Sequence, residues 1–367
     1  MSRSVGIIGT RGYPSYYGGF ETLVRHLSPY LVERGWDVTV YGRVAEVVHD
    51  APRDERVESV LTPGVESKSL SALTHGLTAA VSAARRKHDV ALVMNVANGY
   101  FLPLLRARGI PSVVNVDGIE WERGKWGRAA RAAFRGGARM TARWANHIVV
   151  DSQAIGDYWS REFGRDGTYI PYGGEDPGPT APPPIDFHGK PYALMVARLV
   201  PENSVPEFLD AAEQLAEDWP VVLVGSSGHG SELDDRARYL SAHRRNFHWL
   251  GHLADDNTLY ALWQNAGVYF HGHTVGGTNP ALVQAMACGA PVLARDTVFN
   301  REVLGGAGTY WDGETAPLAS LIDELLDDPR FQRELSEGAR KAAFERFTWD
   351  GVCAAYADVL QLAAERK

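Results

Sequence analysis

The stretch GVYFHGHTVGGTNPALVQAMACGAPVLA, residues 267–294, reads as a strand, a glycine loop, a helix, a glycine and a second strand. Pro280 suits the first helical turn, where its missing N–H is not needed, and Asn279 before it is the natural N-cap. Gly276 and Gly277 allow the backbone ahead of the helix to approach a ligand closely. This helix start therefore predicts an anion site, while an ordinary β–α connection is the structural alternative.

Short apolar runs alternate with helical patterns on both sides of this stretch. In the first half, the strand-like runs are 4–10, 37–42, 90–95, 112–116 and 147–150. In the second half, they are 192–197, 221–225, 247–251, 267–272 and 290–294. Runs that are apolar on both faces are typical of buried parallel strands. The alternation predicts an α/β fold of two Rossmann-like, doubly wound domains facing each other across a cleft.

A stretch dense in Pro and Gly, residues 173–191, separates the two sets of strands and is typical of a semi-rigid linker. The length of 367 residues also favours two domains. We expect an N-terminal acceptor domain over 1–175 and a linker over 176–190 that serves as a hinge. A C-terminal domain then covers 191–347, and a helix over 348–367 packs back toward the N-terminal domain.

Composition excludes several classes of protein. A hydrophobic fraction of 45% indicates globular domains, and a net charge of -8 disfavours bulk nucleic-acid binding. Cys288 and Cys353 lie in apolar, helix-like surroundings without metal-ligand spacing, so we expect two reduced, buried thiols. The sequence shows neither a hydrophobic signal core nor an apolar run long enough to span a bilayer. We therefore expect a cytoplasmic protein that can touch the inner face of a membrane.

The first strand runs into a second glycine loop, with Gly9, Gly12, Gly18 and Gly19 ahead of the first helix. Such a loop can bring backbone amides close to a phosphate, although a turn that needs glycine only for its geometry is the alternative. The pattern is not G-x-G-x-x-G, and the second strand ends in Tyr41-Gly42-Arg43 rather than in an acid. Binding of NAD is therefore disfavoured.

Five motifs together resemble family-4 glycosyltransferases of the GT-B fold, and most of all their rhamnosyltransferase-type branch. The motifs are GTRGYPSYYGGFET (9–22), NVDGIEWERGKW (115–126), ARLVPENS (197–204), HGHTVGGTNPALVQAMACGAPV (271–292) and FNREV (299–303). The resemblance runs from the N-terminus to the last helix. It implies retaining transfer of a sugar, with dTDP-rhamnose favoured, to a hydroxyl of a glycan or lipid-linked acceptor in polysaccharide biosynthesis.

The resemblance also implies that the C-terminal domain holds the nucleotide-sugar donor and that Arg198 clamps its diphosphate with a guanidinium fork. Asn203 stands where the family commonly has a lysine. In place of the family's Glu-x7-Glu pair this chain has Gly276 and Gln284. Gln284 keeps a carbonyl oxygen for the ribose but loses about 1 kcal/mol of charge-assisted bonding. The remaining residues expected at the donor are Gly18, Gly19, His273, Gly277, Thr278 and Asn279.

Asp117 and Glu120 follow a strand of the N-terminal domain and are expected at the mouth of the cleft. Together with Arg198 they are the candidate catalytic residues. Asp117 stands where related enzymes present a histidine to the donor sugar. A carboxylate there can stabilise an oxocarbenium-like transition state or orient the acceptor, and an exposed turn acid is the alternative. Trp121 and Trp126 either stack on a sugar or pack the loop.

We expect neither a metal nor another cofactor. His271 and His273 form a His-x-His pair at a strand end, but no third ligand is spaced to complete a zinc site. The chain also has no Asp-x-Asp triplet to bridge a metal to a diphosphate. Neutral imidazoles near the donor are the better interpretation.

A basic stripe recurs at spacings of three and four residues, which places its members on one helix face. It consists of Arg128, Arg131, Arg135, Arg139 and Arg143. The stripe can dock on anionic lipid, where each basic residue adds about 1 kcal/mol. A solvated helix face is the alternative.

Other functions remain open at this stage. The first is a GT-B transferase or epimerase that uses a UDP- or GDP-sugar. The second is a non-catalytic nucleotide-binding homologue, which Asn203 and Gln284 alone favour. An NAD-dependent oxidoreductase is a distant third. The sequence leaves open the acceptor, the linkage, the donor base and the oligomeric state.

Overall fold

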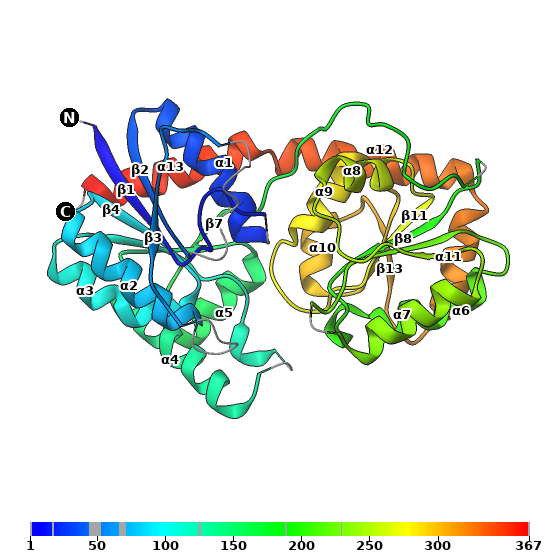
Figure 1. Ribbon diagram of the computed structural model, residues 1–367, viewed down its shortest axis with the longest axis horizontal. Coiled ribbons are helices and arrows are strands. Elements are labelled where there is room, and N and C mark those ends of the chain that lie inside the picture. The colour runs from blue at the N-terminus through cyan, green and yellow to red at the C-terminus, as the bar shows by residue number, and fades with distance from the viewer. Residues whose placement is uncertain are drawn as a thin grey trace. The chain divides into compact units, whose positions relative to one another are not determined.

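The structure is a computed structural model that describes residues 2–16, 18–43, 53–65, 71–123, 126–187, 189–228 and 230–365. The chain divides into two compact units (Figure 1). Unit 1 comprises Met1–Tyr172 and Trp349–Lys367, and unit 2 comprises Gly173–Thr348. The sequence placed the corresponding boundaries at 175 and 347.

Unit 1 is built on a seven-stranded parallel sheet in the order β3-β2-β1-β4-β5-β6-β7. Its strands are β1 (Arg3–Ile8), β2 (Trp36–Arg43), β3 (Glu58–Thr62), β4 (Val90–Met94), β5 (Ser112–Asn115), β6 (His147–Val150) and β7 (Thr168–Tyr169). Its α-helices are α1 (Gly19–Glu33), α2 (Ser71–Arg86), α3 (Leu102–Ala107), α4 (Arg128–Trp144), α5 (Gln153–Phe163) and α13 (Trp349–Glu365). Short 3-10 turns cover Val96–Phe101 and Glu120–Glu122.

Unit 2 repeats the architecture with a six-stranded parallel sheet in the order β10-β9-β8-β11-β12-β13. Its strands are β8 (Ala193–Val196), β9 (Val221–Val224), β10 (Phe247–Trp249), β11 (Val268–His271), β12 (Val292–Arg295) and β13 (Thr309–Trp311). Its α-helices are α6 (Val205–Leu215), α7 (Glu232–His243), α8 (Asp256–Gln264), α9 (Pro280–Cys288), α10 (Val298–Leu304), α11 (Leu318–Leu326) and α12 (Pro329–Arg346). A 3-10 turn covers Pro201–Asn203.

Two parallel-sheet α/β units confirm the predicted fold class, and each of the ten strand-like runs overlaps a strand. Three strands were missed, namely β3, β7 and β13. All three lie at an edge of their sheet. An edge strand is partly exposed, so it lacks the continuous apolar run that marks a central strand.

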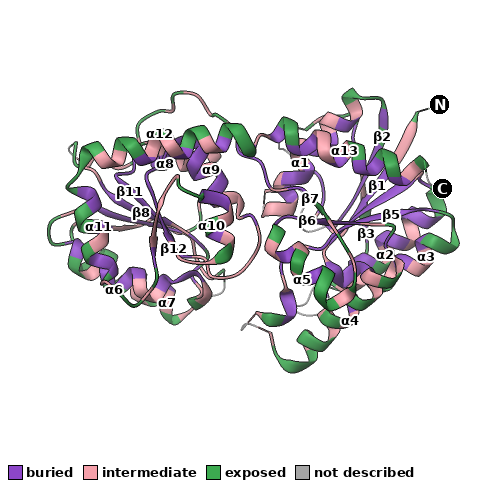
Figure 2. Cartoon of the chain, turned by 180° about the vertical axis from the view of Figure 1, so that it is seen from behind, coloured by how far each residue is buried: buried purple, intermediate pink, exposed green. Residues whose placement is uncertain are grey.

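The apolar cores lie between the sheets and their helices. Figure 2 shows the central strands buried and the outer helix faces exposed. In unit 1, α13 contributes Val352, Tyr356 and Leu360 to the same core as Leu23 and Leu27 of α1. The last helix therefore belongs to the core of the first unit. Burying an aliphatic side chain such as Val352 or Leu360 contributes about 1.5–3 kcal/mol to stability. Cys288 and Cys353 are free and buried, as expected, and burial raises the pKa of each thiol to about 12.

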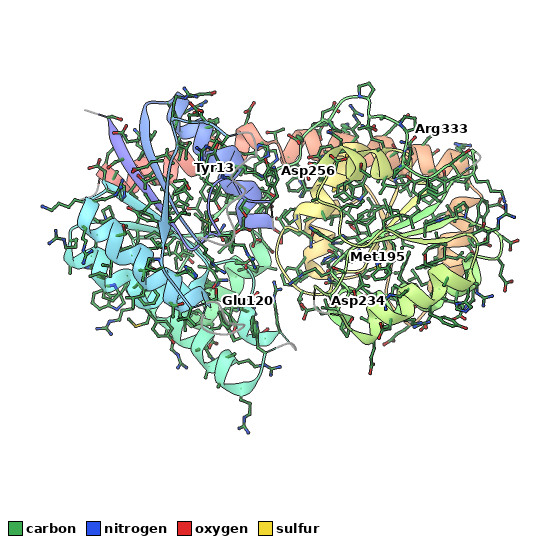
Figure 3. The ribbon with its side chains drawn as sticks, in the orientation of Figure 1. Tyr13, Glu120, Met195, Asp234, Asp256 and Arg333 are labelled. Atoms are coloured by element: carbon green, nitrogen blue, oxygen red, sulfur yellow. The ribbon has the colours of Figure 1, made fainter. Side chains whose placement is uncertain are left out.

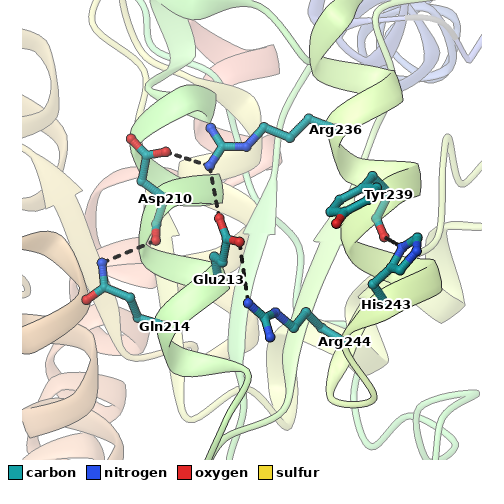
Figure 4. Close-up of polar contacts among 7 residues, drawn as sticks. All are labelled: Asp210, Glu213, Gln214, Arg236, Tyr239, His243 and Arg244. Atoms are coloured by element: carbon teal, nitrogen blue, oxygen red, sulfur yellow. Dashed lines mark hydrogen bonds and ion pairs between the residues drawn. The ribbon is translucent and has the colours of Figure 1, made fainter.

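The outer faces of α6 and α7 in unit 2 are linked by ion pairs (Figure 4). Arg236 lies 2.5 Å from Asp210 and 3.7 Å from Glu213, and Arg244 lies 3.4 Å from Glu213. These groups are largely exposed, so each pair contributes at most about 1 kcal/mol. The packing of this unit therefore depends on its apolar core. Within the described ranges, no helix is both long and apolar enough to cross a membrane.

Candidate nucleotide-sugar site

The strand order of unit 2 reverses at β8, which has β9 on one side and β11 on the other. Such a switch point, at the carboxyl ends of the strands, is where open α/β sheets bind ligands. Arg198 follows β8 by two residues, and His271 ends β11. The structure thus brings together two motifs that lie about seventy residues apart in the chain.

Hydrogen bonds join the loops that follow these two strands. Asn203 Nδ2 donates to the Arg198 carbonyl at 2.9 Å, Ser204 Oγ donates to the Gly272 carbonyl at 2.8 Å, and Thr274 Oγ1 donates to the Glu202 carbonyl at 2.7 Å. Asn203 is only 3% exposed, so its side chain supports the loop instead of presenting a donor ligand. The loop after β8 is therefore held against the loop after β11.

The Arg198 side chain itself is exposed. Its guanidinium makes no hydrogen bond or ion pair with any residue that the structure describes. The main-chain carbonyl of this residue is held by the Asn203 side chain and by the Val200 amide. A free guanidinium at the switch point can bond paired phosphate oxygens without first breaking a protein contact.

The start of α9 has the predicted capping. Asn279 is the N-cap, its Oδ1 accepts from the Ala281 amide at 3.0 Å, and Pro280 opens the helix. Gly276 has φ of 118°, a conformation that favours glycine. The amides of Ala281, Leu282 and Val283 all donate to Asn279. An anion here would therefore meet the helix dipole and the preceding glycine loop more than these first-turn amides.

Two stacked imidazoles stand beside the glycine loop. The rings of His271 and His273 are 4.4 Å apart and inclined by 13°. His271 is fully buried, and its Nδ1 lies 3.0 Å from the Tyr269 hydroxyl. Burial, together with the neighbouring His273, holds the pKa of His271 well below its usual range. Among the described residues, no group of three or more His, Cys, Asp or Glu could hold a metal ion.

Stability should fall below about pH 6.5 because two buried histidines must stay neutral. Burial lowers the pKa of His271 in unit 2 and of His88 in unit 1 from 6.5. The unfolded chain takes up these protons first, so stability is full above pH 6.5 and is lost as the pH falls toward the folded pKa values. Each group contributes a slope of up to about 1.4 kcal/mol per pH unit. Denaturant titration between pH 5 and 8 measures the slope, and His271→Gln should reduce it; an equal slope in this variant would contradict the assignment.

Gln284 does not present a free amide. Its Oε1 accepts from the Glu175 amide at 3.1 Å, and its Nε2 donates to the Glu175 carbonyl at 2.9 Å. A further, longer contact joins Nε2 to Cys288 Sγ at 3.5 Å. The expected carbonyl ligand for a ribose is therefore already occupied by the main chain of Glu175.

In unit 1, the strand order reverses at β1, which lies between β2 and β4. Glycine is needed at position 9, where φ is 88° and a Cβ would lie 2.4 Å from the Met94 carbonyl oxygen. Gly18 is extended, with φ of -171°, and Gly19 begins α1. The sequence missed Glu21, whose buried Oε1 accepts from the Arg11 amide at 3.0 Å and so braces the loop. Tyr17 of this motif lies outside the described residues.

Asp117 follows β5 in a left-handed conformation with φ of 57°, which is uncommon for a residue other than glycine. Its amide donates to Asn115 Oδ1 at 2.9 Å, and Asn115 Nδ2 donates to the Tyr356 hydroxyl at 2.6 Å. Tyr356 lies on α13, 241 residues further along the chain. A buried relay thus holds the backbone of Asp117, and no local signal could have revealed it.

A buried tyrosine lies among the acidic side chains of unit 1. Burial raises the pKa of Tyr172 well above its usual range, and the charges of Asp117 and Asp151 raise it further. Asp151 directly follows β6 and is 2% exposed. Both acids thus stand at the carboxyl edge of the sheet. The sequence did not single out Asp151 or Tyr172.

Glu120, which the sequence placed with the catalytic residues, is labelled in Figure 3. It is 5% exposed, and its carboxylate is bound within its own loop. Its Oε1 lies 2.8 Å from Arg123 Nε, and its Oε2 accepts from Trp126 Nε1 at 2.9 Å. Trp121 is also buried, and it packs against aromatic residues of α5, including Trp159. These contacts favour a structural role for Glu120 and Trp121.

Comparison with known families identifies both halves of the chain. Residues 182–342 match the model of glycosyl transferases group 1, and residues 17–173 match that of glycosyltransferase family 4. Both units carry glycosyltransferase domains.

Solved structures of the GT-B fold support the same architecture. Sucrose-phosphate synthase from Thermosynechococcus elongatus aligns over 100% of both chains with a TM-score of 0.79 and 18% identity. Anabaena HepE in complex with UDP and glucose covers 98% of this chain and 100% of that one, with a TM-score of 0.75 and 18% identity.

Curated relatives match over a shorter part of the chain. The O-antigen chain mannosyltransferase B of Escherichia coli is 24% identical over 43% of this chain and 42% of its own length. An α-1,3-N-acetylgalactosaminyltransferase of Campylobacter jejuni, acting on N,N'-diacetylbacillosaminyl-diphospho-undecaprenol, is 26% identical over 44% of this chain and 42% of its own. The chain thus spans less than half the length of the curated relatives that it matches. The expected rhamnosyltransferase branch, the linker and the cleft remain predictions.

Proposed function

We propose that this chain is a glycosyltransferase that moves a sugar from a nucleotide-diphosphate donor, held by unit 2, to an acceptor hydroxyl. One observation carries the proposal. The free guanidinium of Arg198 stands at the switch point of unit 2, on a loop that is hydrogen-bonded to the loop leading into α9. A cation and a helix N-terminus on adjoining loops suit a diphosphate.

In the proposed reaction, the bond between the sugar C1 and the leaving phosphate oxygen breaks as the acceptor oxygen bonds to C1 on the same face. The acceptor proton passes to the departing phosphate oxygen, so no separate base or co-reactant is needed. Negative charge grows on the diphosphate as its bond breaks. Arg198 and the dipole of α9 stabilise that charge, and such preorganised groups lower a barrier by several kcal/mol.

The donor that we favour is dTDP-rhamnose, on the strength of the five motifs described above. The HepE structure, which contains UDP, makes UDP-sugars the first alternative. The test is a screen of dTDP-, UDP- and GDP-sugars with lipid-linked and free glycan acceptors in the presence of EDTA. We expect transfer with dTDP-rhamnose and no requirement for metal. Free sugar without any transferred product would favour an epimerase, and no turnover of any donor would contradict the proposal.

We further propose that α4 docks on the anionic inner face of a membrane, which would place a cytoplasmic enzyme beside a lipid-linked acceptor. The helix buries Gly137, Ala138 and Thr141, and its arginines face outward. All five arginines of the stripe are exposed: Arg128, Arg131, Arg135, Arg139 and Arg143. Arg135 forms an ion pair with Glu162, which leaves the others as the main source of positive charge on this face.

Neutralising three residues of the stripe should weaken binding to anionic vesicles about a hundredfold, since each basic residue adds about 1 kcal/mol. The variant is Arg128→Gln, Arg131→Gln and Arg139→Gln. Co-sedimentation with phosphatidylglycerol vesicles at 50 and 300 mM salt measures the binding. The matched control neutralises Arg330, Arg333 and Lys341, which are exposed on α12. Equal losses in both variants, or no binding by the wild type, would contradict the docking proposal.

A further inference from the structure

The segment at the start of unit 2 is held to three helices of that unit. We call residues 174–180 the strap. It was expected to begin a hinge, yet side chains from α8, α9 and α12 bind it. The contacts join Gln284 to Glu175, Tyr260 to Glu175, Arg340 to Asp176, and Gln264 to both Gly178 and Thr180.

Gln284 makes the pair of bonds nearest to the point where the chain enters unit 2. Its amide meets both the N–H and the C=O of Glu175, at 3.1 and 2.9 Å. The Glu175 carboxylate in turn accepts from the Tyr260 hydroxyl at 2.6 Å. A glutamine amide offers a donor and an acceptor side by side, which the N–H and C=O of a single residue can match.

Gly174, the first residue of the strap, is held by the chain segment that leaves unit 2. Its amide donates to the Phe347 carbonyl at 2.7 Å, and it forms a parallel bridge with Thr348. A Cβ at Gly174 would lie 3.1 Å from atoms of Val283 and Ala287, so glycine favours this close contact with α9. The chain passes between the units after Tyr172 and again after Thr348. Both passages therefore start beside the bridged pair Gly174 and Thr348, and Gly174 packs against α9.

From these contacts we infer that Gln284 is a positioning residue that fixes both chain passages to the donor helix α9, and that it is not a ligand of the donor ribose. Bending between the units is then confined to Tyr172–Gly173 and Thr348–Trp349, and the Pro-rich segment moves with unit 2. The kinetic part of this inference, which concerns nucleotide binding and turnover, rests on the proposed function. The structural part, which concerns the hydrogen bonds of the strap, does not.

Glutamate is an informative substitution because it conserves the shape and the Oε1 acceptor of Gln284 but not the Nε2 donor. In Gln284→Glu, the Nε2 donor is lost, and a carboxylate faces the Glu175 carbonyl oxygen. Gln284→Met removes both bonds without adding charge. Gln264→Met is the matched control, because Gln264 also bonds the strap through both ends of its amide, but from α8 and farther from the passage.

Hydrogen exchange resolved at single amides tests the structural part in the full-length protein. The Glu175 amide should exchange at least about tenfold faster in Gln284→Met, with Thr180 unchanged, because the bond to Oε1 is lost. In Gln264→Met, the Thr180 amide should exchange faster and the Glu175 amide should not. An unchanged rate at Glu175 in Gln284→Met would overturn the inference.

Nucleotide binding and turnover test the kinetic part. Gln284→Glu should leave the Kd for dTDP within about threefold of the wild type. It should lower kcat for transfer about tenfold and raise the ratio of donor hydrolysis to transfer, because the passages are no longer fixed. Tighter binding of dTDP by tenfold or more in Gln284→Glu would show a ribose ligand and overturn the inference. If the wild type binds no nucleotide diphosphate, the proposed function fails, while the exchange result still decides the structural part.

Discussion

Replacing Arg198 by alanine should lower kcat/KM for sugar transfer about 10²–10³-fold, because it removes the cation that faces the developing charge on the diphosphate. Nothing in the described part of the chain bonds the Arg198 guanidinium, so its removal leaves no buried partner unsatisfied. The melting temperature should therefore stay close to that of the wild type. Initial rates over a range of donor concentrations, with a thermal melt on the same samples, measure both effects.

Arg198→Lys is the matched control for this experiment. It keeps the charge and loses the planar fork, so it should recover only part of the rate. An Arg198→Ala enzyme with the kcat/KM of the wild type would contradict the placement of the diphosphate in unit 2. A lowered melting temperature together with a lowered rate would show a structural role for the residue.

Replacing Asp117 by asparagine should lower kcat about 10²-fold while leaving the Kd for the nucleotide unchanged. A carboxylate at this position can stabilise positive charge that develops on the sugar ring in the transition state, and the amide cannot. Asparagine tolerates the left-handed backbone at φ of 57°, so the fold should be retained. Separate measurement of kcat and of dTDP binding distinguishes this role from donor binding.

Asp117→Gly serves as the control for backbone strain, since glycine adopts the same φ without cost and lacks the carboxylate. We expect it to be as slow as the asparagine variant and at least as stable as the wild type. Full activity in either variant would show that Asp117 is only a turn residue. The Asn115–Tyr356 relay would then have a purely structural purpose.

The fold could be predicted because its signals are local. Central strands appear as apolar runs, and the start of α9 is set by Asn279 and Pro280, which act within one turn. The edge strand β3 was missed because only one of its five residues, Thr62, is buried. Where unit 2 begins is only partly determined by the local sequence. The prolines of the linker predict a loose segment, whereas the side chains that bind it come from helices 84 to 164 residues away in the sequence.

The candidate site divides in the same way. Residues whose role follows from the type of loop, such as Gly276, are recognisable in the sequence. Those whose role depends on a distant partner are not. Gln284 was assigned to donor binding and Glu120 to catalysis, whereas the structure uses the polar atoms of both within the fold. Tyr356 supports Asp117 from the other end of the chain, so only the folded structure could reveal it.

Calorimetric titration of dTDP and UDP in the presence of EDTA, combined with hydrogen exchange, tests the central claim most directly. We predict saturable 1:1 binding of at least one of the two, at least about tenfold weaker in Arg198→Ala. Slower exchange should appear in the loops around residues 198–204 and 272–279. Absence of binding, or binding that protects only amides of unit 1, would contradict a nucleotide-sugar site at the switch point of unit 2.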